Sequence, residues 1–176
     1  MITIRGTQKF LKKIKKPPQA NLEPSSNALG DWYANLIDSD AGQLIIFVNE
    51  KSFLTVGVPV LEIKNLFSLF IQRVLNLLWL IGVPRLVIEL EHVEMMKMQI
   101  GKTKDRSVIG AMNELAFSYQ IYAEDQVGQG KLSLQDAEQE FSKTPLSPLG
   151  YQYPRDVAKR LLLETWGIGT AREKKS

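Results

Sequence analysis

His92 is the one histidine of the chain, and acidic residues surround it in the segment RLVIELEHVE. A histidine with several carboxylates can bind a divalent metal ion or transfer protons as a general acid or base. The segment has the pattern of a strand, however, and strand alternation directs His92 to one face and Glu89 and Glu91 to the other. We therefore predict no metal site. His92 is kept as a catalytic candidate beside a structural role near a sheet edge.

The basic segment GKTKDRS looks at first sight like a phosphate-binding loop. A Walker A loop requires a glycine at the position that Met96 occupies, so nucleotide hydrolysis is not expected. Lys102, Lys104 and Arg106 still precede a predicted helix N-terminus, where N–H groups and the helix dipole favour an anion. The alternative is a solvated basic turn in which Ser107 caps the helix.

Other catalytic arrangements find little support. One histidine and no nucleophile-elbow motif leave no basis for a Ser–His–Asp triad, and the absence of cysteine excludes disulfides, thiolate zinc sites and cysteine nucleophiles. Arg106, Ser107 and Asn113 remain as polar candidates, although six residues of separation place Ser107 and Asn113 poorly on one helix face. We predict no cofactor and favour a protein that is not an enzyme.

Two further residues are candidates for binding. Trp32 follows a long loop and precedes a strand, so stacking on a base or a partner is one interpretation and core packing is the favoured one. Asn49 lies between two apolar strands in FVNEKSFL, where a hairpin turn is the plain explanation.

Positive charge is concentrated at the two ends of the chain. Residues 1–16 hold six basic residues and no acid, residues 171–176 hold three basic residues and one acid, and the middle holds 13 basic and 18 acidic residues, for a net charge of +3. Nucleic acid, if bound, would contact the Lys102–Arg106 turn and the lysines of the first segment. These lysines are Lys12, Lys13, Lys15 and Lys16. The acidic body is free to face a basic partner.

The length of 176 residues, 44% of them hydrophobic, suits one domain with a sizeable core. Residues 1–176 are taken as a single domain with a Pro/Ser-rich loop at 17–30 and a basic tail at 171–176. The apolar stretch 66–83 is long enough to cross a bilayer, but Gln72 and Arg73 interrupt it, so we interpret it as a buried helix and expect no membrane contact. The N-terminus lacks a secretory signal, which favours a cytoplasmic location.

The elements expected to position these residues follow a mixed order. MITIR predicts a short strand, and a basic helix capped by Thr7 follows it. Residues 31–60 predict two or three antiparallel strands, residues 62–81 the buried helix, and residues 85–93 another strand. Helices capped by Ser107 and Ser133 come next, and Pro154 opens the last one. The predicted fold is α+β, with a small antiparallel or mixed sheet covered by several helices.

Three strings together resemble an uncharacterised bacterial domain family: LGDWYANLI (29–37), LIIFVNEKSFL (44–54) and GKTKDRSVIGAMNELAF (101–117). The most specific element is Arg-Ser-Val-x-Gly-x-Met-Asn, at residues 106–113. The family pattern has Asn, Ser and Asp where this chain has Asp105, Ala111 and Glu114. The resemblance covers nearly the whole chain and implies a bacterial intracellular protein, with no reaction to carry over.

Gly110 is unusual inside the first turns of a predicted helix, because glycine there costs roughly 1 kcal/mol relative to alanine. Close approach by another backbone or by a ligand would account for it. Tight packing against the sheet would account for it equally and is the commoner cause.

These observations favour a non-catalytic bacterial binding or regulatory protein, in a defence or toxin–antitoxin context, that acts through a protein partner. The alternative is a nucleic-acid-binding or nucleic-acid-processing protein that uses the basic N-terminal helix and the Lys102–Arg106 turn. An enzyme would be favoured if the polar candidates converged on one concave pocket. These candidates are Trp32, Asn49, Arg106, Ser107 and Asn113.

Overall fold

The computed structural model describes residues 1–40, 42–128 and 133–167. The strands are β1 (Ile2–Gly6), β2 (Trp32–Ser39), β3 (Gly42–Asn49), β4 (Thr55–Pro59) and β5 (Met98–Lys102). The helices are α1 (Gln8–Ile14), α2 (Leu66–Leu80), α3 (Arg85–Met95), α4 (Arg106–Gly128), α5 (Leu134–Ser142) and α6 (Pro154–Trp166), with 3-10 turns η1 (Val60–Asn65) and η2 (Ser147–Leu149). The predicted basic tail at 171–176 lies outside the described residues.

The five strands form one mixed sheet in the order β4-β3-β2-β1-β5. β2, β3 and β4 are an antiparallel meander, and β1 is parallel to both β2 and β5. The predicted α+β class and the meander are therefore confirmed. The predicted strand at 85–93 is wrong, since these residues belong to α3, and the fifth strand instead follows that helix.

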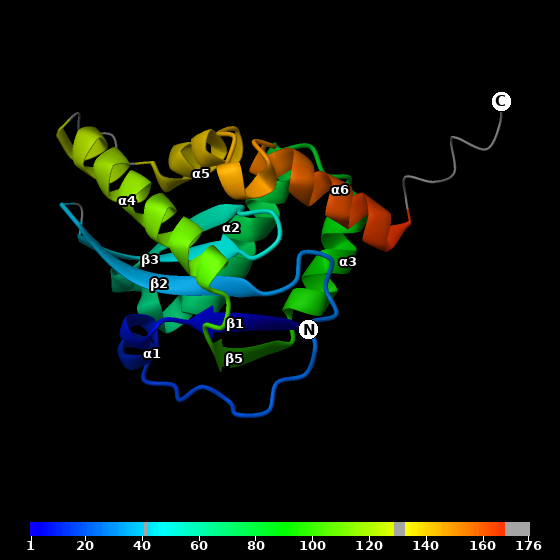
Figure 1. The fold of residues 1–176 in the computed structure, drawn as a ribbon, viewed down its shortest axis with the longest axis horizontal. Helices are drawn as coiled ribbons and strands as arrows, with labels where there is room; N and C mark the ends of the chain where they lie inside the picture. The colour runs from blue at the N-terminus through cyan, green and yellow to red at the C-terminus, as the bar shows by residue number, and fades with distance from the viewer. Residues whose placement is uncertain (41, 129–132, 168–176) are drawn as a thin grey trace.

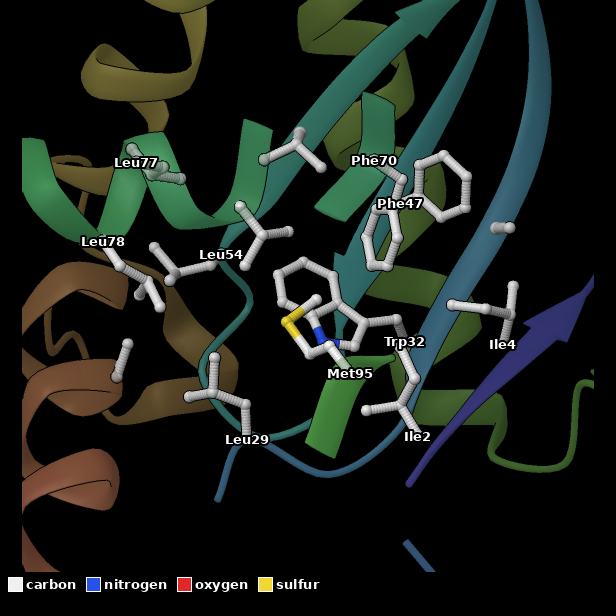
Figure 2. Close-up of a cluster of buried hydrophobic side chains, with 14 of the residues drawn as sticks. Ile2, Ile4, Leu29, Trp32, Phe47, Leu54, Phe70, Leu77, Leu78 and Met95 are labelled. Atoms are coloured by element: carbon white, nitrogen blue, oxygen red, sulfur yellow. The ribbon is translucent and has the colours of Figure 1, made fainter. Parts of the chain in front are cut away.

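Helices cover both faces of the sheet (Figure 1). α1, α2, α3 and α6 contribute to one apolar cluster with Ile4, Trp32 and Phe47, and α4 and α5 contribute to the other with Tyr33 and Val48. Neighbouring residues of a strand point to opposite faces, so Trp32 and Tyr33 enter different clusters. Figure 2 shows Trp32 in the middle of the first cluster, among side chains from β1, β3, α2 and α3.

Local sequence signals account for most helix starts. Thr7 Oγ1 accepts from the Phe10 N–H at 3.3 Å, and Ser133 caps α5 in the same way, as predicted. Pro154 is the first residue of α6. The cap predicted at Ser107 is wrong, because the Asp105 carboxylate accepts from the Ser107 N–H at 2.8 Å and so precedes the helix as its cap.

The segment 17–30, predicted as a Pro/Ser-rich loop, is folded against the sheet. Figure 1 shows it passing along β5 and returning beside α3. The Gln19 N–H donates to the Ile100 carbonyl at 2.8 Å, on the outer edge of β5. The Gln99 side chain accepts from the Glu23 N–H at 3.2 Å and donates to the Glu23 carbonyl. The segment therefore covers part of an edge that would otherwise be open.

At the opposite edge of the sheet, a side chain of α5 accepts from a backbone N–H of β4. Glu138 of α5 is 2% exposed and accepts from the Gly57 N–H of β4 at 3.0 Å. Arg73 of α2 donates to the same carboxylate oxygen at 2.8 Å. Burial raises the pKa of Glu138, and the Arg73 guanidinium and the Gly57 N–H oppose that rise.

Residues 66–80 of the apolar stretch form α2, which buries Phe70, Val74 and Leu78 against the sheet and leaves Gln72 exposed. The helix predicted from residue 62 begins four residues later, because the 3-10 turn η1 precedes it. This is the buried helix with one wet face that its polar stripe predicts. In the ranges that the structure describes, every helix falls short of the length and apolar character that a membrane span requires.

Candidate functional site

The five polar and aromatic candidates do not meet in one pocket. Trp32 and Asn49 are register partners on β2 and β3, and both are fully buried. Arg106, Ser107 and Asn113 are exposed on α4, which covers the other face of the sheet from the Trp32 ring. The arrangement that would have favoured an enzyme is therefore not formed.

Trp32 and Asn49 have structural roles. The Trp32 ring packs edge-on against Phe70 with the ring centroids 5.3 Å apart. Asn49 donates to the Leu29 carbonyl at 2.9 Å and accepts from the Ser52 N–H at 2.9 Å, which holds the 49–52 turn against the preceding segment. Core packing and a hairpin turn, the favoured interpretations of these residues, match what the structure shows.

His92 lies on α3, and the helix places it in the lining of the same cavity as Glu89, whereas the predicted strand would have put the two on opposite faces. Glu89 is exposed and paired with Arg85 at 2.8 Å, while Glu91 is fully buried on another face of the helix. Within the described ranges, no group of three or more His, Asp or Glu residues is arranged to hold a metal ion. His92 instead lines a groove described below.

The three strings of the family resemblance meet at one end of the sheet. The Asp31 N–H donates to the Glu50 carboxylate at 3.0 Å, and Lys104 Nζ lies 3.7 Å from the Asp31 carboxylate. The Tyr33 hydroxyl accepts from the Asp105 N–H at 3.2 Å. Residues from strings far apart in the sequence therefore support each other within the fold.

An ion pair lies at the centre of this cluster. The Arg5 guanidinium pairs with Asp31, both side chains are buried, and Arg5 also donates to the Lys102 carbonyl at 3.1 Å. The Ser25 hydroxyl donates to the second Asp31 oxygen. The pair thus connects β1 to the segment 17–30 and to the end of β5. Its polar atoms are used in hydrogen bonds within the fold.

Glu91 is a second buried anchor that the sequence did not reveal. Its carboxylate accepts from the Ala28 N–H at 2.9 Å, the Leu29 N–H at 3.2 Å and the Asn27 amide at 3.0 Å. The Trp166 indole N–H adds a fourth bond. A carboxylate with four N–H donors replaces much of its lost hydration, which permits a glutamate at a core position.

The basic candidates are spread over several surfaces. Lys12, Lys15, Lys102 and Arg106 are exposed to solvent. Lys13 Nζ donates to the Gln43 side chain at 2.9 Å, and Lys16 Nζ lies 5.1 Å above the Phe67 ring. Lys13 of α1 therefore extends toward β3, and Lys16, just after α1, extends toward the start of α2.

An apolar cavity of about 560 Å³ opens between α2, α3 and β5. Its walls are mostly aliphatic, aromatic and methionine side chains, with Ser68, Gln72, His92 and Lys16 as the polar members. The apolar members are Phe67, Ile71, Leu75, Met95, Met96, Met98 and Ile100. A concave apolar surface with a few polar groups is the usual form of a binding site.

A second cavity of about 460 Å³ continues the first toward the end of α2. The two share Leu75 and His92, and the second adds Trp79 and Ile88. Trp79 is 62% exposed and Met96 is 67% exposed, so large apolar side chains stand at the rim. We refer to the two cavities together as the α2–α3 groove.

The other end of the groove is basic. A cavity of about 350 Å³ adjoins the first at Phe67 and Lys16. Its walls include Lys13, Lys15 and Lys64. We refer to this cavity as the lysine cavity.

Gly110 lies on the exposed face of α4, and a Cβ built there would meet no atom within 4 Å. Packing against the sheet, the commoner cause of a helical glycine, is therefore wrong for this residue. The exposed Phe117, 63% accessible, lies two turns further along the same helix.

The sequence matches the DUF6933 family, a domain of unknown function, over residues 3–157. The chain belongs to this family. Neither the curated proteins nor the solved structures compared with it gave a match. The predicted membership of an uncharacterised domain family is thus confirmed.

The groove could not be assembled from sequence alone. Phe67, Ile71, Leu75 and Trp79 recur every four residues on α2, and this spacing is the signal of one continuous helix face. That stripe is indistinguishable from a second buried face until the neighbouring elements are placed. The second wall lies on α3 and β5, neither of which the sequence predicted correctly.

Proposed function

We propose that the protein is a non-catalytic binding protein that recognises another protein through the α2–α3 groove. The observation that carries the proposal is the groove itself, an open apolar surface formed by two helices and an edge strand. Contiguous exposed apolar surface on a soluble fold marks an interaction site in most cases.

The side chains at the rim favour a protein as the bound molecule. Trp79 and Met96 are among the most exposed large apolar residues of the chain. Tryptophan and methionine are enriched at protein interfaces, where a flexible thioether adapts to a partner and an indole buries a large area. The charged pair near the groove, Arg85 with Glu89, stands at its edge as a polar rim would.

The proposal can be tested by placing a photo-reactive amino acid at Trp79 and, as a matched control, at Phe117. Both positions carry an exposed aromatic residue, and they lie on helices that cover opposite faces of the sheet. In cells that produce the protein, a groove-bound partner should give one adduct at position 79 that is absent at position 117. The adduct is identified by mass spectrometry.

The identified partner is then purified, and its affinity is measured by calorimetry. It should bind the wild-type chain, and Trp79→Ala should weaken binding at least about tenfold while Phe117→Ala leaves it unchanged. Equal adducts at both positions, or equal affinity for the two variants, would contradict a binding function located in the groove.

The setting of this function is also part of the proposal. The sequence resemblance supports a bacterial, cytoplasmic protein, and a regulatory role in defence or in a toxin–antitoxin pair remains our prediction. Identification of the partner tests this setting directly.

A nucleic-acid-binding function is the second candidate. Gly6 of β1 pairs with Lys102 of β5, which brings the basic helix α1 and the Lys102–Arg106 turn to the same end of the sheet. Each phosphate contacted on duplex DNA should contribute about −0.9 to the slope of log affinity against log salt. Reversing the charge at Lys12, Lys13, Lys15 and Lys16 should weaken binding and flatten the slope. No change in either quantity would reject this candidate.

A further inference from the structure

We infer that the partner segment recognised by the α2–α3 groove is an acidic amphipathic helix, whose apolar face fills the groove and whose carboxylates meet the lysine cavity. This inference rests on the proposed function and names the chemistry of the partner.

The length of the groove fits a helix. Its α2 wall runs from Phe67 to Trp79, and twelve residues of helical rise span about 18 Å. An occupant helix needs about three turns to cover that distance. Two helices with a trough between them offer parallel ridges, and a third helix packs into such a trough at about 8 to 10 Å between axes.

The composition of the walls fits an apolar helix face. Ile71 and Leu75 on α2 oppose Ile88 and Met95 on α3, and each is partly or fully buried by its own fold. An amphipathic helix in the groove would contact these walls with apolar side chains, such as leucines, that recur every three or four residues along it. Other helix-in-groove interfaces use the same spacing.

The charges around the groove indicate the charge of the partner segment. Lys13, Lys15, Lys16 and Lys64 border the lysine cavity, and no acidic side chain lines either that cavity or the larger apolar one among the residues that the structure describes. At the opposite end Arg85 is already neutralised by Glu89. The field is therefore positive at one end of the groove and balanced at the other, which selects a helix with carboxylates near one terminus.

Two other occupants fit less well. A second copy of this chain would bring another basic cavity to the same region when the grooves face each other in parallel. A long-chain carboxylate could place its head at Lys16 and its tail in the 560 Å³ cavity, but it would leave the second cavity and Trp79 uncovered. Both occupants are outcomes of the test below.

The test uses the full chain and a synthetic helical peptide of about 18 residues, with leucines at four- and three-residue spacing on one face and three glutamates in one terminal turn. A matched peptide has lysines in place of the glutamates. Binding of each labelled peptide is followed by fluorescence anisotropy. The acidic peptide should bind at least about tenfold more tightly than the basic one, and added salt should reduce that difference.

Variants of the chain locate the contacts. The double variant Lys16→Glu with Lys64→Glu should bind the acidic peptide at least about tenfold more weakly. Trp79→Ala should weaken the binding of both peptides. Lys9→Glu on the exposed side of α1 and Phe117→Ala on α4 are the matched controls, and neither should change affinity. Circular dichroism confirms that each variant is folded.

The remaining outcomes separate the inference from the proposed function. Equal binding of the two peptides, with loss of both in Trp79→Ala, would reject the acidic partner and retain a protein-binding groove. If neither peptide bound, the inference would be rejected. The cross-linking experiment would then test the proposed function independently. Lys16-dependent binding of dodecanoate without peptide binding would overturn both, and a dimer dissolved by Trp79→Ala would replace the acidic helix with a second copy.

Discussion

Glu91 accepts a hydrogen bond from the indole N–H of Trp166, 75 positions further along the chain, at 3.2 Å. The same carboxylate holds the Ala28 and Leu29 N–H groups. One side chain of α3 therefore joins the segment 17–30 and α6 directly. A polar residue in the core acts here as the meeting point of three parts of the fold.

Glu91→Ala should destabilise the protein by about 3 kcal/mol or more, because it leaves three buried N–H donors and the partly buried Trp166 indole N–H without an acceptor. Glu91→Gln keeps one acceptor oxygen and should cost roughly half as much. Urea unfolding measures both. Glu89→Ala on the exposed side of the same helix is the control and should cost less than about 0.5 kcal/mol. A loss in Glu91→Ala no larger than this control would show that the four bonds contribute little.

The buried pair of Arg5 and Asp31 should show strong coupling between its two partners. Asp31→Leu leaves an unpaired guanidinium in the core and should cost about 3 to 5 kcal/mol, whereas the double change Arg5→Met with Asp31→Leu should cost less than that single change. A double-mutant cycle measured by chemical denaturation gives the coupling. Additive effects of the single changes would disprove the coupling.

Glu138 should make stability depend on pH in a definite direction. Because its folded pKa is raised, the folded chain holds a proton at a pH where the unfolded chain has lost it. The contribution of this group is therefore fully present below the unfolded pKa and is lost as pH rises through the folded pKa. The unfolding free energy of the wild type relative to Glu138→Gln should increase as pH falls from neutral toward the ordinary glutamate pKa. A difference that stays constant or decreases on acidification would contradict the raised pKa.

Gly110→Ala should stabilise the isolated protein by about 1 kcal/mol, since the added methyl meets no atom and alanine is the better helix former. For a chain of this size the melting temperature should rise by about 2 to 4 °C in a thermal scan. Ala111→Gly, one position further on the same helix, is the reverse control and should lower it. A lower melting temperature for Gly110→Ala would show an unfavourable contact that the exposed face of α4 does not reveal.

Prediction from sequence succeeded where local signals were undisturbed. The Thr7 and Ser133 caps, the antiparallel meander and the buried helix α2 all follow from capping chemistry and apolar spacing. It failed at α3, where Leu86, Ile88 and Leu90 alternate as in a strand. The buried face of α3 consists of Val87, Glu91 and Met95, which are spaced by four residues. Because Glu91 is charged, the apolar spacing of a helix is not visible in the sequence. A core glutamate becomes intelligible only when its distant N–H donors are known.

The candidate site shows the same limit. The lysines and Trp79 are visible in the sequence, but the groove needs β5, a short strand whose alternation of Met98, Gln99 and Ile100 is too brief to identify. The segment 17–30 has the composition of a linker, yet side chains far away in the sequence, such as Gln99, fix its backbone. The composition of a segment does not reveal its hydrogen bonds to residues far away in the sequence.

The position of β1 in the sheet has a consequence for how the chain folds. Thr3 and Gln99 are register partners separated by 96 positions, whereas β2, β3 and β4 lie within residues 32–59. During synthesis the meander can form early, but the first strand keeps one edge open until β5 has left the ribosome. Completion of the sheet therefore depends on one parallel pairing between strands far apart in the sequence, and pairing of this kind slows folding.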